Sequence, residues 1–400
     1  MNFDLPEEIV AVQESVRKLV KTRLEPEIGG YEEKQSFPYA LIREMGEAGL
    51  FGAVFPEQLG GSDMGFLAVA VISETLSETV PEFGYAMNMQ AMTCPFTIYN
   101  WGTNEQVEKY IPGLIAGQQL GMFALTEPGG GSDAAGSMKS TAVREGDYYV
   151  LNGSKQWITF SNVCDTGVVF AKTNPSAGHK GISAFIIEPK KTTGYQADPI
   201  AIRSLSKSMR SCSVFFDEVK IPVENRLGEE GEGFKVAMSA LEYGRLTVSA
   251  RLVGLAQGCL NEAIDYAQNR VIKGAAIGHY QMVQHLIADM TVHISAARLM
   301  VYRMAQLMDE GRAANRASSQ AKYFASIAAK HAGQSAAEIF GGYALADDYL
   351  VSKLNGYINM LNVGEGAPAV QRILIAEDAL GYKNANRHPI KNRARQESVL

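Results

Sequence analysis

Two nearby stretches of the chain hold the residue types that a flat, phosphate-bearing cofactor needs. Residues 123–133 (FALTEPGGGSD) read as a short strand that breaks at Pro128 into three glycines. Glycines let backbone amides lie close to a bound anion, because no Cβ is in the way. Residues 152–159 (NGSKQWIT) place an aromatic plane at Trp157 and a hydroxyl at Thr159, and strand alternation puts both on one face. Together the stretches predict a site for such a cofactor.

A third stretch, residues 365–372 (EGAPAVQR), begins with Glu365 between Gly364 and Gly366. A glutamate in a glycine-flanked loop is usually a solvated surface residue, so the residue types leave two interpretations open. In the other interpretation the carboxylate is a general base. Such a base gains from a desolvated site that raises its pKa toward neutrality.

The spacing of apolar residues predicts three layers that would position these stretches. Apolar residues recur every three or four positions up to about residue 116, every second position from 121 to 233, and again at helical spacing from 234 onward. The Ala- and Met-rich stripes of the last part are typical of a four-helix bundle. We therefore predict an α+β fold with an N-terminal helical domain (1–120), a central antiparallel β domain (121–233), a C-terminal four-helix bundle (234–385) and a basic tail (386–400).

Composition narrows the function class. The chain has 400 residues, 46% hydrophobic and 20% charged, which is ordinary for a globular enzyme, and its net charge of −6 argues against a nucleic-acid partner. The four cysteines are scattered, and no histidines lie at metal-ligand spacing near them, so the sequence predicts no metal site. The acidic start and the lack of a long apolar window predict no secretory signal and no membrane insertion, hence a cytoplasmic protein. The glycine loop at 227–233 reads as a hinge between domains rather than a calcium or dinucleotide loop.

The three stretches, in this order, resemble the signatures of the acyl-CoA dehydrogenase family, and the resemblance covers the chain to about residue 380. It implies a helix, β, helix fold with FAD in the β domain. The implied reaction forms an α,β-enoyl-CoA: a base removes the α-proton of the thioester while the β-hydride goes to flavin N5. Aligned through Gly366, Gln371 and Arg372, Glu365 falls on that base. Its N–H would form an oxyanion hole with a flavin ribityl hydroxyl.

The resemblance also implies binding residues. Leu125, Thr126 and Ser132 would contact the flavin ring edge and pyrophosphate, Trp157 would pack on the ring, and Thr159 would bond near N5. The alternatives without a cofactor are that Trp157 is a core tryptophan and that Ser132 is only a turn residue. For the CoA part the matching pair is Glu242 and Arg245. Its alternative is an exposed i, i+3 ion pair on a helix.

Other residues imply an oligomer. Arg270 and Gln281 resemble residues that reach the FAD of a neighbouring subunit, and Glu338 and Gly342 match the same half-site, so we expect a homotetramer built from two dimers. The expected partners are an acyl-CoA and an electron-transfer flavoprotein. Departures from the family pattern lie around the adenosine half of FAD and the subunit contact, and put FAD affinity in doubt more than the chemistry: Lys273 for a packing Phe, Glu338 for a Gln, Gly356 and Tyr357 in place of Arg-Asp, and Ala367 for a hydroxyl-bearing residue.

The substrate is inferred from residues 84–92. Glutaryl-CoA dehydrogenases carry an arginine at the position of Gly84, so the sequence predicts no cation there and disfavours glutaryl-CoA. Members with a relocated base carry it at the position of Gly244, which excludes that arrangement. Tyr85 and Met89 would line the acyl end and favour a short, branched or alicyclic acyl group. The alternatives are an enoyl-CoA reductase running the reverse reaction, or a redox-silent acyl-CoA-binding or flavin monooxygenase relative.

Overall fold

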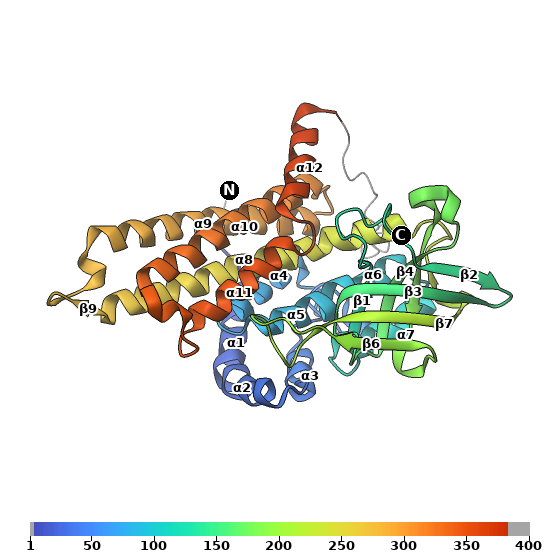
Figure 1. Cartoon of the computed structure of the whole chain (residues 1–400), viewed down its shortest axis with the longest axis horizontal. Helices are drawn as coiled ribbons and strands as arrows, with labels where there is room; N and C mark the ends of the chain where they lie inside the picture. The colour runs from blue at the N-terminus through green and yellow to red at the C-terminus, as the bar shows by residue number, and fades with distance from the viewer. Residues whose placement is uncertain (1–3, 383–400) are drawn as a thin grey trace.

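The computed structural model describes residues 4–382, which form a helical layer, a twisted sheet and a long bundle (Figure 1). The predicted basic tail at 386–400 lies outside these residues. The N-terminal layer contains α1 (Glu7–Leu19), η1 (Val20–Leu24), α2 (Glu25–Lys34), α3 (Tyr39–Glu47), η2 (Glu57–Leu59), α4 (Gly65–Ser77), η3 (Pro81–Phe83), α5 (Gly84–Met87), η4 (Asn88–Thr93), α6 (Pro95–Trp101) and α7 (Asn104–Ile115).

Helix α4 is the central helix of this layer. It begins with a run of apolar residues, and nearly all of its residues are buried, including the polar Ser73, Glu74, Thr75 and Ser77. Because Glu74 is paired with Arg298 at 2.7 Å, even its charged residue needs no solvent face. The layer therefore encloses α4 rather than leaving it at the surface, and the long bundle helix α8 covers it from the other side.

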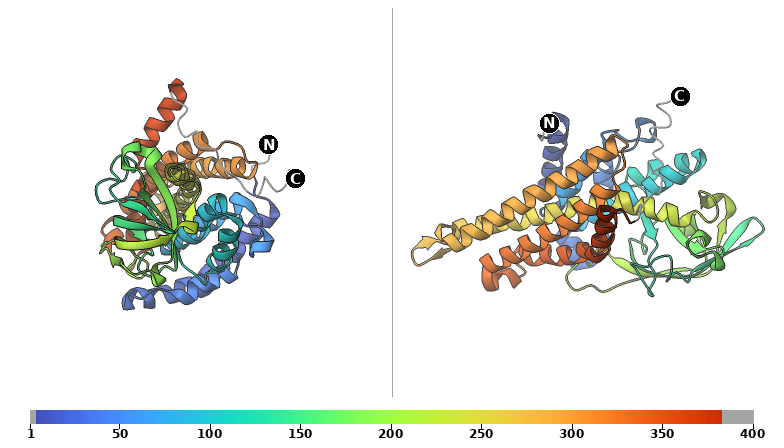
Figure 2. Two further views of the ribbon diagram at one scale, coloured as in Figure 1. Left: turned by 90° about the vertical axis from the view of Figure 1, so that its right-hand side faces the viewer. Right: turned by 90° about the horizontal axis from the view of Figure 1, so that it is seen from above.

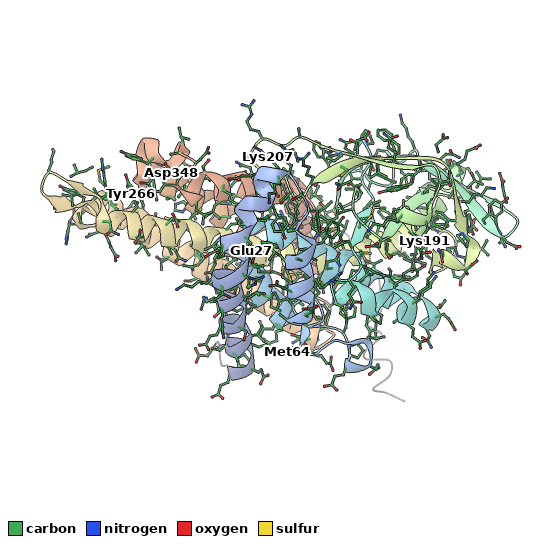
Figure 3. The ribbon with its side chains drawn as sticks, turned by 90° about the horizontal axis from the view of Figure 1, so that it is seen from below. Glu27, Met64, Lys191, Lys207, Tyr266 and Asp348 are labelled. Atoms are coloured by element: carbon green, nitrogen blue, oxygen red, sulfur yellow. The ribbon has the colours of Figure 1, made fainter. Side chains whose placement is uncertain are left out.

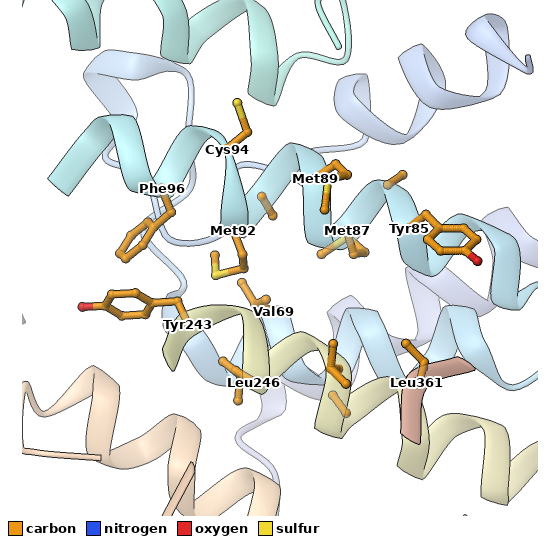
Figure 4. Packing of buried hydrophobic residues seen from close by; sticks show 14 of the residues in the cluster. Val69, Tyr85, Met87, Met89, Met92, Cys94, Phe96, Tyr243, Leu246 and Leu361 are labelled. Carbon is orange, nitrogen blue, oxygen red and sulfur yellow. The ribbon is translucent and has the colours of Figure 1, made fainter. Parts of the chain in front are cut away.

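A π-helical segment interrupts the helix that runs from Gly84 to Trp101. Here η4 follows α5 directly, and the Thr93 hydroxyl donates to Asn88 O at 2.9 Å across the wide turn. Figure 4 shows Tyr85, Met87, Met89 and Met92 along this segment. Single π-helical turns inside helices are frequent at functional sites. Asn88 is the first residue of this π-turn.

The middle of the chain forms a sheet in the order β6-β7-β3-β2-β4-β5-β8, with β1 beside β4. Most neighbours are antiparallel, as predicted, but β1 and β2 each pair with β4 in parallel. The strands are β1 (Gly121–Ala124), β2 (Thr141–Glu145), β3 (Tyr148–Thr159), β4 (Thr166–Lys172), β5 (Ile182–Ile187), β6 (Tyr195–Pro199), β7 (Ser211–Pro222) and β8 (Arg226–Leu227), with short 3₁₀ turns η5 (Pro175–Gly181), η6 (Pro189–Lys191) and η7 (Val223–Asn225).

Strand β3 is irregular where the second motif lies. Its pairing with β7 shifts register between Lys155 and Ile158, and Trp157 within the shift has φ +65°. An extra residue on one strand bends it and re-aims the side chains near it. The bulge turns the indole of Trp157 outward while Ile158 stays buried.

The C-terminal part is a bundle of long helices that run side by side (Figure 2). Glycines let α8 approach the N-terminal layer closely, since a Cβ at Gly254 would lie 2.1 Å from Glu74 O and one at Gly258 2.2 Å from Glu78 O. The elements are α8 (Gly233–Asn269), β9 (Val271–Ile272), β10 (Ala275–Ala276), η8 (Ile277–His279), α9 (Gln281–Asp309), α10 (Asn315–Phe340), η9 (Gly341–Leu345), α11 (Leu350–Val363) and α12 (Pro368–Leu380).

The helix, sheet, helix order confirms the predicted fold class. None of the helices within residues 4–382 is long and apolar enough to cross a membrane. The same part of the chain holds no cluster of His, Cys, Asp and Glu suited to a metal ion, and all four cysteines are buried free thiols. The domain boundaries at 120 and 233 stay predictions.

Candidate active site

Glu365 sits in the tight loop where α11 ends and α12 begins. Its φ is +53°, a left-handed conformation that non-glycine residues adopt rarely, and Gly366 follows with φ +100°. Such a conformation costs about 1–3 kcal/mol and persists where the surroundings hold it. Pro368 at the first turn of α12 then restarts the helix, because its fixed φ suits that position.

Three buried donors hold the carbonyl groups around this loop. The Lys322 ammonium on α10 donates to Leu361 O at 2.9 Å and Asn362 O at 3.1 Å. Arg245 Nε donates to Glu365 O, and Gln371 Nε2 to Gly366 O, each at 3.3 Å. Burial lowers the pKa of Lys322 to about 7, against the attraction of Glu365. Sequence analysis missed Lys322, because it lies on a helix far from the motif.

The Glu365 side chain points into the protein. Oε1 accepts from Asn88 Nδ2 at 3.2 Å, while Oε2 is sealed from solvent and has no hydrogen-bond partner, although the residue as a whole is only partly buried. Burial raises the pKa of this carboxyl, and the Asn88 hydrogen bond and the charges of Arg245, Lys322 and Arg251 oppose the rise. The interpretation as a solvated loop glutamate is therefore wrong.

Gly244 on α8 makes the space that this carboxylate occupies. A Cβ at Gly244 would lie 2.7 Å from Glu365 Oε2, closer than real Cβ atoms come to other atoms. Any side chain at 244 would displace Glu365. The two positions that the resemblance gives as alternatives for a base thus compete for the same volume, and in this chain the side chain of Glu365 fills it from the loop.

A short relay orients Asn88. The Thr247 hydroxyl lies 2.7 Å from Asn88 Oδ1 and 2.9 Å from Gly244 O, and its single proton can serve either oxygen. Donation to Oδ1 turns the Nδ2 of Asn88 toward Glu365. Sequence analysis missed this residue, although it lies one turn after Gly84 in the segment expected at the acyl end.

The first two motifs meet through a buried ion pair. Lys155 Nζ lies 2.8 Å from Glu127 Oε1 and also donates to Leu125 O at 3.2 Å, and Gln156 N donates to Thr126 O at 2.9 Å. Burial lowers the pKa of Lys155 to about 8. Burial would raise the pKa of Glu127, but Lys155 and hydrogen bonds from Ser140 and Lys139 lower it. Glu127 and Lys155 each lie inside one of the first two motifs, so their opposite charges were a signal in the sequence that could have predicted this ion pair.

The surface beside this junction fits a planar, phosphate-bearing cofactor. Trp157 is 56% exposed, which rules out a core tryptophan. Gly129, Gly131 and Ser132 are exposed in this turn, whereas Gly130 packs on Ser137 and its amide donates to Glu127 O at 3.1 Å. The Thr159 hydroxyl is half-buried and 3.1 Å from Ser211 Oγ. The hydrogen bond from Gln156 N to Thr126 O joins the two motifs, so the exposed indole, the glycine turn and the Thr159 hydroxyl belong to neighbouring segments. These are the features that FAD would cover.

Glu242 and Arg245 are both buried, so the exposed ion-pair interpretation is wrong. Arg245 points to the backbone of Glu365, whereas Glu242 Oε1 has no hydrogen-bond partner and burial raises the pKa of Glu242 to about 7. The Tyr243 hydroxyl and Gln371 Oε1 are likewise buried and unpartnered. Unmet polar atoms around Arg245 are expected where a polar ligand binds.

The remaining predicted FAD residues lie at the opposite end of the molecule. Arg270 and Gln281 flank the hairpin of β9 and β10, far from the sheet in Figure 1, and Figure 3 shows Tyr266 and Asp348 at that end and Lys191 at the other. The Arg270 guanidinium stacks 5.6 Å from the Tyr343 ring. Exposed Glu338 accepts from Gln334, and Gly342 has no atom near its missing Cβ. The structure thus does not bring these residues to Trp157 within one chain.

The departures from the family pattern lie in different local settings. Lys273 and Gly274 are both left-handed in the hairpin turn. A Cβ at Gly356 would lie 2.4 Å from Ser204 O, and the buried Tyr357 hydroxyl accepts from Ser206 N at 3.1 Å. Ala367 occupies the N-cap position of α12 and makes no side-chain capping hydrogen bond there.

The predicted acyl end holds a cation that the sequence analysis excluded. A Cβ at Gly84 would lie 2.3 Å from Nε of Arg251, which reaches across from α8. Its guanidinium lies 5.2 Å from the Tyr85 ring, and that ring lies 5.9 Å from Tyr357. The expectation of no cation at Gly84 is therefore wrong. Met89 is buried, and the Thr93 hydroxyl lies 3.7 Å from its sulfur. Its role at the acyl end stays a prediction.

Comparison with known proteins places all three parts of the chain in one family. Family models described as the N-terminal, middle and C-terminal domains of acyl-CoA dehydrogenase match residues 6–118, 122–219 and 231–380. The chain is 37% identical to a protein named glutaryl-CoA dehydrogenase from Desulfococcus multivorans, over 97% of this chain and 100% of that one.

Two further similarities bear on substrate and direction. A solved glutaryl-coenzyme A dehydrogenase in complex with glutaryl-CoA has 36% identity and a TM-score of 0.93, covering 97% of this chain and 98% of that one. A protein named caffeyl-CoA reductase-Etf complex subunit CarC, from Acetobacterium woodii, is 36% identical over 90% of this chain and 96% of its own length. Solved structures with similar folds include complexes with FAD.

Proposed function

Because this chain belongs to the acyl-CoA dehydrogenase family, whose members are FAD-dependent oxidoreductases, we propose that it acts on a short acyl-CoA with Glu365 as the catalytic base. One observation carries the proposal. The Glu365 carboxylate is held in a left-handed loop over Gly244, with Oε2 buried and without a partner. A desolvated carboxylate with a free oxygen is suited to taking a proton from carbon.

The cofactor, Glu365 and the backbone of Glu365 each have a separate role in the proposed reaction. FAD, when bound, supplies the acceptor for the hydride that leaves Cβ. Trp157, Thr126, Ser132 and Thr159 would hold its ring and phosphates. Glu365 Oε2 takes the α-proton, and the electron pair of that C–H bond forms the new double bond. The Glu365 N–H makes no hydrogen bond within the described residues and is free to donate to the thioester oxygen as negative charge develops there.

The test replaces Glu365 with Gln, which keeps the shape and removes the base. We expect turnover to fall by about 10²–10⁴-fold, while FAD content and acyl-CoA affinity are unchanged. The matched control is Glu57→Gln, an exposed carboxylate in the same protein. Turnover is measured with a panel of acyl-CoA thioesters and an artificial electron acceptor. Near-normal turnover of Glu365→Gln with any of them would place the base elsewhere.

We also propose an electron-transfer flavoprotein as the partner. The similarity to a subunit named as part of an Etf complex supports it, and the same name, caffeyl-CoA reductase, supports enoyl-CoA reduction as the second candidate. The two directions share every residue described above, and they differ in which electron carrier reacts with the flavin. Anaerobic stopped-flow with acyl-CoA, and separately with enoyl-CoA after chemical reduction, would give the faster half-reaction. A cytoplasmic location stays a prediction.

A further inference from the structure

Lys322 on α10 is fully buried, and all three protons of its ammonium have acceptors. Leu361 O lies 2.9 Å from Nζ, Asn362 O 3.1 Å and Ser326 Oγ 3.2 Å. The Ser326 hydroxyl donates its own proton to Lys322 O at 2.8 Å, so toward Nζ its oxygen can only accept. Lysines are almost never fully buried unless they are paired, yet within residues 4–382 no carboxylate contacts this ammonium. The contacts of Lys322 therefore point to the carbonyl groups of α11 rather than to an ion pair.

These two carbonyls belong to the last turn of α11, which ends at Val363. The last carbonyls of a helix lack partners within the helix, and their partial negative charge favours a cation beside them. Lys322 supplies that cation from a neighbouring helix. The chain then passes through Gly364 to Glu365, whose left-handed φ of +53° aims the base into the protein. Lys322 thus caps the helix end that leads directly into the loop of the base.

Charged groups face Lys322 from three elements. Burial lowers the pKa of Lys322 to about 7, the carboxylate of Glu365 opposes this, and the charges of Arg245 on α8 and Lys330 on α10 add to it. Lys322 is therefore charged at acidic pH, where the acid limb of a base is measured. Burial raises the pKa of Glu365, and the charge of Lys322, like those of Arg245 and Arg251, opposes the rise. The two buried groups thus act on each other's ionisation without direct contact.

We propose that Lys322 is a positioning residue for the base: its hydrogen bonds to the end of α11 hold the Glu365 loop in place, and its positive charge favours the ionised carboxylate. This rests on the proposed function, since it assigns a supporting residue to the same base. Lys322 acts through Glu365 and takes no part itself in the proton or hydride transfer. The two effects can be separated, because the hydrogen bonds need a donor and the electrostatic effect needs a charge.

The experiment uses two variants of the FAD-loaded enzyme. Lys322→Met removes both the charge and the donors, whereas Lys322→Gln removes the charge and keeps an amide that can donate. In both, the acid limb of log kcat/KM should move up by about half to one pH unit, because the pKa of the base rises when the cation is lost. On the plateau, where the base is ionised, kcat should fall by about 10²-fold in Lys322→Met and by less in Lys322→Gln. The control is Lys330→Met, an exposed lysine on the same helix, which should leave both values unchanged because solvent screens its charge.

Infrared titration of the Glu365 carboxyl band provides a readout that does not depend on turnover, and Glu365→Gln identifies the band by its loss. The midpoint of this titration should move up in both Lys322 variants and stay in place in Lys330→Met. Flavin content and thermal melting verify that each variant is folded, and if Lys322→Met does not fold, Lys322→Gln against the parent tests both roles.

Two results would overturn the proposal. An unmoved limb and band in the Lys322 variants would remove the electrostatic role, and an unchanged plateau would remove the role in holding the loop. A failure of the proposed function looks different. If the carboxyl band moves as expected but no acyl-CoA reduces the flavin of the parent enzyme, the proposed function fails and the coupling of Lys322 to Glu365 stands.

Discussion

At the scale of single residues, the site depends on a carboxylate kept both buried and correctly aimed. Asn88 does this with one hydrogen bond to Glu365 Oε1, and Thr247 fixes the direction of the Asn88 amide. The hydrogen bond favours the ionised carboxylate, so it counteracts the pKa rise that burial causes. Asn88 is therefore a positioning residue that also sets the pH range of the base.

Asn88→Leu should shift the pH dependence of activity. Loss of the hydrogen bond raises the pKa of Glu365 further, and since the base must be deprotonated, the acid limb of log kcat/KM should move up by about one pH unit. Activity should recover at higher pH. Thr247→Val keeps Asn88 and should shift the limb less. A fall of equal size at every pH would mean that Asn88 acts only by shape.

At the scale of elements, the cofactor site depends on how two motifs are joined. The Glu127–Lys155 pair ties the end of β1 to the bulged part of β3, and both charges are buried. Removing one partner leaves the other charge buried and unpaired, which costs about 3–5 kcal/mol, whereas replacing both can be nearly neutral. The pair thus matters more for the geometry of the junction than for net stability.

Lys155→Met should therefore lower the free energy of unfolding by about 3–5 kcal/mol and weaken flavin retention. Glu127→Gln combined with Lys155→Met should restore most of the stability. Denaturant unfolding followed by circular dichroism, with flavin released per chain, measures both effects. If the single variant is as stable as the parent, the ion pair does not organise the junction.

At the scale of the whole molecule, the predicted FAD residues separate into two distant groups. Thr126, Ser132 and Trp157 lie on the sheet, and Arg270 and Gln281 lie at the far end of the bundle (Figure 1). The far end also exposes large apolar side chains, with Met282 at 84% and Leu345 at 82%. Exposed apolar clusters of this kind mark interaction surfaces. A second copy that brings its bundle end to the first copy's sheet would join the two groups.

We expect a tetramer of two dimers in solution, with each cofactor contacted by two chains. Arg270→Met should then reduce flavin content while each chain stays folded, because the change acts on a neighbour's cofactor. Light scattering with absorbance at the flavin band gives mass and cofactor content together. A monomer carrying a full complement of flavin would remove the cross-subunit assignment of Arg270 and Gln281.

The sequence by itself determined the layers and the motifs. Apolar spacing gave the helix, sheet, helix order, because a buried face repeats every 3.6 or every two residues along one element. The glycine turn at 129–131 and the loop at Glu365 could also be predicted, since each depends on its own backbone and nearest neighbours. The exposure of Trp157 could not, because it depends on how β3 pairs with β7.

Only the tertiary structure decided the environment of each group. Whether Glu365 is solvated depends on Gly244 and Asn88, and whether a cation reaches Gly84 depends on Arg251, which lies on another helix. In the sequence, Gly84 reads as an absent side chain, and Arg251 as one more helical arginine. In the structure the first makes room for the second. Burial and charge pairing belong to contacts between elements, and no single segment of the chain contains both partners.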